Sequence, residues 1–147
     1  TADNRRKFSD VYDIVHDQLC IRWNITMGLY WIRPYSFINL DSRNRWFITN
    51  VQNMPGEFVV AAEKKLKKVP YAADYLEIKD LCKKVLDAGQ YDYKSFPDLS
   101  YTAWIVSEKV NQEKSVEKAK RLPKQNFSNG LCHYYRHYVI WEDLRHQ

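Results

Sequence analysis

The hydrophobic pattern of residues 74–89 is the feature of the sequence that most constrains its fold. Apolar side chains recur there every three or four residues, the spacing of one helix face: Tyr75, Ile78, Cys82 and Val85. Asp74, with Glu77 three residues later, forms a capping-box signature at the start of this stretch. Gly89 suits the left-handed position that ends many helices. The pattern predicts an amphipathic helix between Asp74 and Gly89.

Further helices are predicted on both sides of this one. Residues 4–19 carry one apolar face, residues 43–49 follow the capping side chains of Asp41 and Ser42, and residues 57–69 end before Pro70. Another helix is expected to begin at Asp98 or Ser100 and to reach residue 110. Its buried face consists of Leu99, Ala103, Val106 and Val110.

Residues 21–40 do not have a single interpretation. They are apolar and rich in β-branched and aromatic side chains, which fits either a buried helix or short strands, and Pro34 interrupts both. The predicted fold class is therefore mainly α with minor β. We expect a single compact helical domain over residues 1–110, a polar linker or exposed helix over 111–126, and an aromatic C-terminal segment, 127–147, that packs on the domain.

The composition is that of an ordinary soluble globular domain. Hydrophobic residues make up 45% and charged residues 28% of the 147, which is enough to bury a core. No apolar run is long enough to span a bilayer, and the first residues have no signal-peptide core. Three widely spaced cysteines fit reduced thiols, so we expect a cytoplasmic protein: Cys20, Cys82 and Cys132. Because the first residue is not Met, we also expect a processed or excised piece of a longer chain.

The sequence predicts neither a catalytic residue nor a cofactor. Four glycines leave little material for a phosphate-binding loop, and no hydrolase or metalloprotease signature occurs. Glu77 and Lys79 have the acid-x-Lys spacing of a nuclease, but they lie within the clearest predicted helix, and Pro97-Asp98 follows rather than precedes them. We therefore expect a non-enzymatic protein.

Two His/Cys pairs could form a zinc site. His16 with Cys20, and His133 with His137, are spaced four residues apart, which places each pair on one face of a helix. Single His and Cys residues on apolar faces are more often part of the core, and no Cys-x-x-Cys knuckle occurs. We therefore expect no metal site.

Binding residues are expected in the basic, aromatic segment 22–68. This segment holds eight Lys and Arg against three Asp and Glu, a net charge of +5 that equals the net charge of the whole chain. Guanidinium groups can pair with phosphate, and neighbouring rings can stack on bases. The predicted nucleic-acid-binding residues are Arg33, Arg43, Arg45, Tyr35, Trp46, Lys64, Lys65, Lys67 and Lys68.

The same residues allow a second interpretation. The arginines can pair with nearby acids such as Asp41, and the rings can belong to the core. Alternatively, exposed rings can form an apolar hot-spot patch. The chain is then a protein-interaction or scaffolding domain that does not bind nucleic acid.

Residues 28–45, GLYWIRPYSFINLDSRNR, resemble a segment that precedes the AAA+ motor of McrB-like restriction proteins. Residues 75–78, YLEI, and 96–104, FPDLSYTAW, also fit this resemblance, which covers residues 4–110. The resemblance implies a DNA-associated accessory or recognition module of a modification-dependent restriction GTPase, a defence system. Its partners would be DNA and other domains or subunits of a larger restriction complex. Because the chain has no Walker A motif, nucleotide hydrolysis would take place elsewhere.

Overall fold

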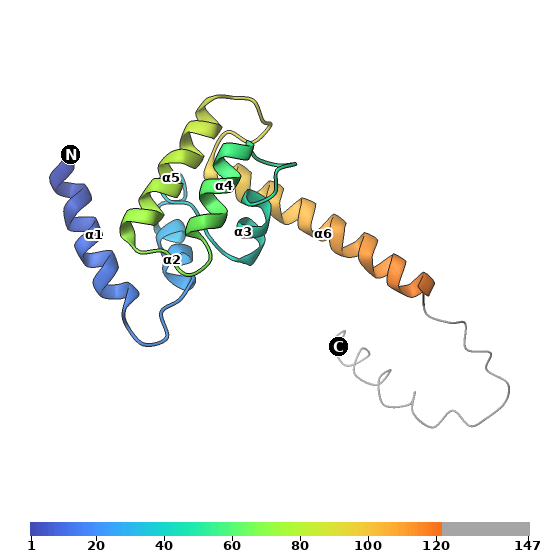
Figure 1. Cartoon of the computed structure of the whole chain (residues 1–147), viewed down its shortest axis with the longest axis horizontal. Helices are drawn as coiled ribbons and strands as arrows, with labels where there is room; N and C mark the ends of the chain where they lie inside the picture. The colour runs from blue at the N-terminus through green and yellow to red at the C-terminus, as the bar shows by residue number, and fades with distance from the viewer. Residues whose placement is uncertain (122–147) are drawn as a thin grey trace, which may run out of the picture. The chain divides into compact units, whose positions relative to one another are not determined.

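In the computed structural model, residues 1–121 are described, with side chains up to residue 118. This part of the chain forms six helices and no strand (Figure 1). The prediction of a mainly α fold is confirmed, whereas the predicted minor β structure does not occur within residues 1–121. The predicted aromatic segment 127–147 lies outside the described residues. The helices are α1 (Ala2–His16), α2 (Asn24–Ile32), α3 (Ser42–Ile48), α4 (Gly56–Lys65), α5 (Ala72–Asp87) and α6 (Phe96–Arg121).

Helix α5 is at the centre of the core. It lies between α1 and α4 in Figure 1 and packs against both. Three residues of its predicted apolar stripe, Tyr75, Ile78 and Cys82, are completely buried. The rest of the core includes side chains of α3, α4, α6 and the connecting segments, among them Ile38, Leu40, Phe47, Met54, Val59, Ala62, Phe96 and Leu99.

The start of α5 differs from the prediction. The helix begins at Ala72, and Asp74 lies in its first turn instead of capping it. The carboxylates of Asp74 and Glu77 instead bind Lys65 Nζ of α4, at 2.5 and 3.0 Å. The first backbone N–H of α5, that of Ala72, donates to Asp13 Oδ1 of α1 at 2.7 Å. The cap thus comes from a residue distant in sequence, which no local pattern can reveal.

The ambiguous segment 21–40 is partly helical. It forms α2, and the chain then turns through residues 33–37. The hydroxyl of Thr26 donates to the carbonyl of Trp23 at 2.8 Å and accepts from the Leu40 N–H at 3.1 Å. Thr26 is the one fully buried residue of α2. The helix therefore lies on the surface of the domain and is not a core helix.

Other boundaries are close to those predicted. Asp41 caps α3 by accepting from the Asn44 N–H at 2.8 Å. Gly89 has φ +68°, as expected for the residue that ends α5. Helix α1 ends at His16 and α4 ends at Lys65, so both stop three or four residues earlier than predicted.

Helix α6 starts earlier and continues further than predicted. Ser95 Oγ donates to Asp98 Oδ2 at 2.6 Å, and the Asp98 N–H donates back to Ser95 Oγ at 3.3 Å. This reciprocal cap starts the helix at Phe96. Residues 111–121 are helical and residues 111–118 are exposed, which fits the exposed helix that was the alternative to a linker, while 122–126 lie outside the described residues. Residues 1–113 form one compact unit, and a second unit begins at residue 114, within α6.

Candidate interaction surface

Two of the predicted phosphate contacts, Arg43 and Arg45, are engaged inside the domain. Arg43 Nη2 is 2.5 Å from Glu108 Oε1 of α6. The guanidinium carbon of Arg45 lies 3.7 Å from the centre of the Trp23 ring, and its Nε donates to the Asp41 carbonyl at 3.3 Å. Burial lowers the pKa of Arg45, partly opposed by the nearby Asp41 carboxylate. The Arg43 side chain is still 42% exposed, so these internal contacts use part of each guanidinium group.

The predicted lysine cluster divides into two groups. Lys65 is paired with two carboxylates of α5, as described above, and hydrogen bonds with Asp74 and then Glu77 raise its pKa. Lys64, Lys67 and Lys68 are exposed. These three cations remain accessible to an anionic partner.

The two most exposed rings of the described residues lie at the end of α2. Trp31 and Tyr35 are each 75% exposed, and Arg33 between them is also exposed. Trp46 on α3 is only 38% exposed. Of the predicted site, therefore, Arg33 and Tyr35 are placed together with Trp31 at an accessible position.

A groove between α1 and α2 is lined almost entirely by apolar side chains. Its volume is about 520 Å³. The side chains that line it come from successive turns of both helices and, apart from the Lys7 ammonium and the buried Tyr12 hydroxyl, are apolar. They are Lys7, Phe8, Val11, Tyr12 and Val15 of α1, and Ile25, Leu29 and Ile32 of α2, with Gly28 between them.

Gly28 leaves space in this groove. A Cβ atom added to it would meet nothing within 4 Å, even though the residue lies within a helix that packs on the domain. Trp31 follows three residues later and is therefore a neighbour of Gly28 on the helix surface. The groove thus combines an open floor at Gly28 with an exposed ring beside it.

Internal contacts hold the two walls of the groove in place. On α1, the Phe8 ring stacks on Phe37 at 5.4 Å and the Tyr12 ring stacks on Tyr75 of α5 at 5.3 Å, while the Tyr12 hydroxyl donates to the Pro70 carbonyl at 3.2 Å. On α2, Thr26 anchors the helix to Leu40. Each wall therefore has its own attachment to the core, and the space between the walls remains open.

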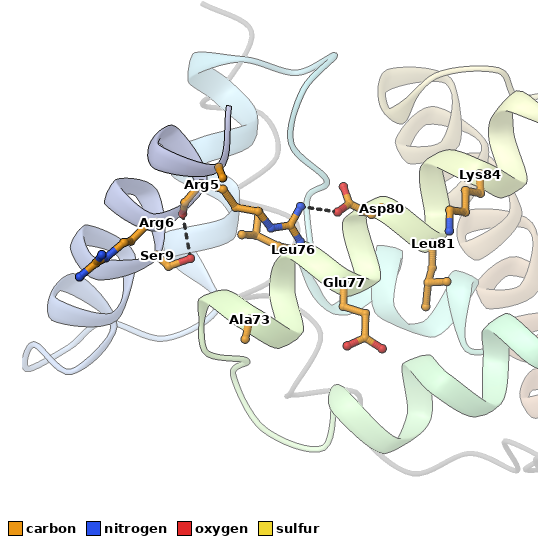
Figure 2. Close-up of a pocket in the computed structure, with 10 residues that line it drawn as sticks. Arg5, Arg6, Ser9, Ala73, Leu76, Glu77, Asp80, Leu81 and Lys84 are labelled. Carbon is orange, nitrogen blue, oxygen red and sulfur yellow. Dashed lines mark hydrogen bonds and ion pairs between the residues drawn. The ribbon is translucent and has the colours of Figure 1, made fainter.

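A second hollow, between α1 and α5, has a different chemistry. It has a volume of about 600 Å³ and is lined by charged side chains. Arg5 Nη1 of α1 pairs with Asp80 Oδ2 of α5 at 2.8 Å, while Arg6 points away from this pair (Figure 2). Burial alone would raise the pKa of Asp80, but hydrogen bonds from Lys79 and Arg5 hold it below the usual value. The Arg5–Asp80 ion pair crosses this hollow and joins α1 to α5, while Glu77 at its edge pairs with Lys65 of α4.

The nuclease-like and metal-site pairs do not assemble in the described part of the chain. Lys79 pairs with Asp80 and Glu77 pairs with Lys65. Cys20 lies beyond the end of α1 and has φ +67°. The helix face that the four-residue spacing predicted for His16 and Cys20 therefore does not form. Within residues 1–118 no group of three or more His, Cys, Asp or Glu side chains is placed to hold a metal ion. His133 and His137 lie outside the described residues.

The buried thiol is also unsuited to chemistry. Cys82 is completely buried in α5, and burial raises its pKa to about 12. It therefore stays protonated at neutral pH and acts as a small apolar side chain.

Among the residues described, no helix has the length and apolar character needed to cross a membrane.

Comparison with known proteins places this domain in a family. A family model described as "Domain of unknown function (DUF8425)" matches residues 1–106. The chain belongs to this family. The DUF8425 match includes both walls of the α1–α2 groove and all of α5. No curated protein and no solved structure matches the chain.

Sequence reasoning missed the α1–α2 groove as a site. The apolar face of residues 4–19 was visible in the sequence, but it was interpreted as one stripe facing the core. In the structure, Tyr12 faces the core, whereas Val11 is 61% exposed and Ile14 is 65% exposed. A signal was present, because Val11, Tyr12, Ile14 and Val15 are four apolar residues within five positions and cover a wider arc of the helix than one narrow buried stripe.

Proposed function

We propose that this DUF8425 domain is a protein-interaction module that binds a partner through the α1–α2 face. The observation that carries the proposal is the groove of about 520 Å³ lined almost entirely by apolar side chains. Soluble monomers rarely leave a continuous apolar surface open without a use. Aromatic and aliphatic side chains around a hollow are also the usual components of an interface hot spot.

Helix-in-groove recognition fits this shape best. A partner helix would place its apolar side chains between α1 and α2, along the line from Val15 and Ile25 to Lys7 and Ile32. This mode needs apolar anchors at helical spacing on the partner and little charge inside the groove. Lys7 is the one charged residue that lines the groove.

A site-specific photocrosslinker tests this function directly. We would place p-benzoylphenylalanine at position 28 of the full chain, where added atoms meet open space, and at position 56 as a matched control. We expect a discrete adduct from position 28 and none from position 56. If position 28 gives no adduct, in native extract or with the chain alone, the groove does not take a protein partner.

Nucleic-acid binding is a second candidate, favoured by the exposure of Trp31, Arg33 and Tyr35 within five residues. Under this proposal the chain is a DNA-associated accessory module of an McrB-like restriction complex. Its phosphate contacts would be Arg33 with Lys64, Lys67 and Lys68, because Arg43, Arg45 and Lys65 are engaged internally.

Fluorescence anisotropy with duplex, cytosine-methylated duplex and single-stranded DNA tests this second candidate. Neutralising Arg33, Lys67 and Lys68 together should weaken binding and reduce the slope of log K against log salt by up to about 0.9 for each lost contact with duplex DNA. Arg43→Ala is the comparison, because Arg43 already pairs with Glu108, and it should change the slope less than the loss of an unpaired cation does. Equal loss of binding to all three DNAs at near-physiological salt would remove nucleic acid as a specific partner.

A further inference from the structure

We infer that the occupant of the α1–α2 groove is a second copy of this chain, docked with its α1 antiparallel to the first. The inference rests on the proposed protein-interaction function and names the partner. Three properties of the same face support it: its extent, its shape and its charge pattern.

The extent of the apolar face suits a dimer interface. A standard interface buries about 800 Å² on each partner, and an aromatic side chain alone contributes about 150–250 Å². Six large apolar side chains of α1, α2 and the turns that follow them are at least 61% exposed, and Val11 and Ile32 among them line the groove. They are Val11, Ile14, Leu19, Trp31 and Ile32, with Tyr35 just after α2.

The shape of the face is self-complementary. In a two-fold symmetric interface the same patch must supply both the projecting side chains and the hollows that receive them. Here Gly28, whose missing side chain leaves open space, and the exposed side chains of Val11 and Ile32 line the same groove. A patch that was only a groove or only a ridge would instead require a different protein as its partner.

The charges of α1 favour an antiparallel copy. Residues 5–7 are three consecutive cations, while Asp10, Asp13 and Asp17 follow toward the C-terminal end. Asp3 in the first turn and His16 in the last turn suit the helix dipole, so the dipole does not require the basic and acidic halves between them. An antiparallel second α1 would bring the basic half of each helix against the acidic half of the other.

Lys7 and Asp10, which lie three residues apart on α1, are the charged groups least used inside the domain. Arg5, Asp13 and Asp17 are already used inside the domain, by Asp80, by the Ala72 N–H, and by His16 with Tyr71 respectively. Lys7 borders the groove and has only the exposed Asp3 as a partner, at 2.7 Å. Asp10 is exposed and makes no ion pair within the described residues. Two-fold symmetry would form the Lys7–Asp10 pair twice.

Other occupants fit less well. Nucleic acid would have to place phosphates beside apolar walls and near Asp3 and Asp10. A different protein helix would need its own acidic and basic halves in the matching order. The nine residues of α2 carry no charge, so the charge match depends on α1 alone.

Sedimentation equilibrium of the 147-residue chain, from micromolar to submillimolar concentration, is the first test. We expect a concentration-dependent dimer of the 17.6 kDa chain. Gly28→Trp should fill the hollow and give a monomer with an unchanged circular dichroism spectrum. Gly56→Trp, also placed in open space but outside the groove, should remain a dimer. A monomeric wild type, or a dimer that Gly28→Trp leaves intact, would overturn the inference.

Charge reversal tests the antiparallel arrangement. Lys7→Glu and Asp10→Lys should each raise the dimer Kd about tenfold, because each change affects two symmetric pairs. The chain that carries both changes should return to within about threefold of the wild-type Kd, since every pair is then restored with its signs exchanged. A double variant that is weaker than either single variant would overturn the antiparallel pairing.

The photocrosslinking experiment separates this inference from the proposed function. An adduct at position 28 with twice the mass of the chain supports the second copy. An adduct with another protein would overturn the second copy and leave the interaction function in place. A crosslink within one chain, at monomer mass, would overturn the inference by showing that the chain covers its own groove.

Discussion

Helix α5 and the α1–α2 pair contain similar kinds of apolar side chains but use them differently. The 16 residues of α5 include six that are buried, whereas α1 and α2 together bury only Tyr12 and Thr26. Val11, Ile14, Trp31 and Ile32 remain exposed on the latter pair. Apolar residues of α5 therefore contribute to the core, whereas many of those in α1 and α2 remain accessible, as the proposed interaction requires.

The largest expected effect on stability is the difference between shortening an isoleucine to alanine in α5 and making the same change in α2. Ile78→Ala in α5 deletes a completely buried side chain and should lower the free energy of unfolding by about 2–5 kcal/mol. Ile32→Ala in α2, 76% exposed, should change it by no more than about 0.5 kcal/mol. Urea denaturation at submicromolar concentration, where self-association contributes least, measures both values. If both variants lost the same free energy of unfolding, the proposed contrast between α5 and α2 would be wrong.

A smaller loss of stability is expected where α1 caps the start of α5. Asp13→Ala removes the carboxylate that accepts the Ala72 N–H and should cost about 1 kcal/mol, as for the loss of a helix cap. Asp10→Ala on the same helix is the control, because its carboxylate is exposed, and should leave the stability unchanged. If both variants unfold like the wild type, α1 does not cap α5.

Gly28→Ala should increase stability. The added methyl group meets nothing within 4 Å, and alanine restricts the unfolded chain more than glycine does. The expected gain is about 0.5–1 kcal/mol in urea denaturation. Gly89→Ala provides the contrast, because its φ of +68° strains any other residue, and this variant should be destabilised.

The smallest effect concerns Asp17, which follows α1. A hydrogen bond from His16, and then one from Tyr71, holds the pKa of Asp17 below its usual value. Its stabilising contribution is therefore complete above the unfolded pKa of about 4 and is lost as the pH falls through the lower folded pKa. The melting temperature of Asp17→Asn should lie slightly below that of the wild type at neutral pH. The difference should disappear in acid, and a difference independent of pH would contradict this assignment.

Local patterns predicted the helices but not their exposure. The stripe of Tyr75, Ile78 and Cys82 identified α5 because every third or fourth residue had to be buried. The caps at Asp41 and Gly89 were also predictable, since they depend on neighbouring residues. The start of α5 was not, because its cap comes from Asp13, 59 residues earlier.

The candidate site was less predictable for the same reason. Arg43 was recognised as a cation able to bind phosphate, but its partner Glu108 lies 65 residues away. Whether an apolar side chain such as Val11 faces the core or solvent depends on which helices lie beside it. That information is tertiary, and no single stretch of the sequence contains it.

The Asp13 cap has a consequence for shorter forms of this chain. A form that began after α1 would lose the acceptor for the Ala72 N–H, the Tyr12 ring that covers Tyr75, and the Arg5–Asp80 pair in one step. It would also leave the Pro70 carbonyl without the Tyr12 hydroxyl. The domain therefore depends on α1 for its stability. An alternative start site or proteolysis that removed α1 would destabilise α5 and would also remove one wall of the groove.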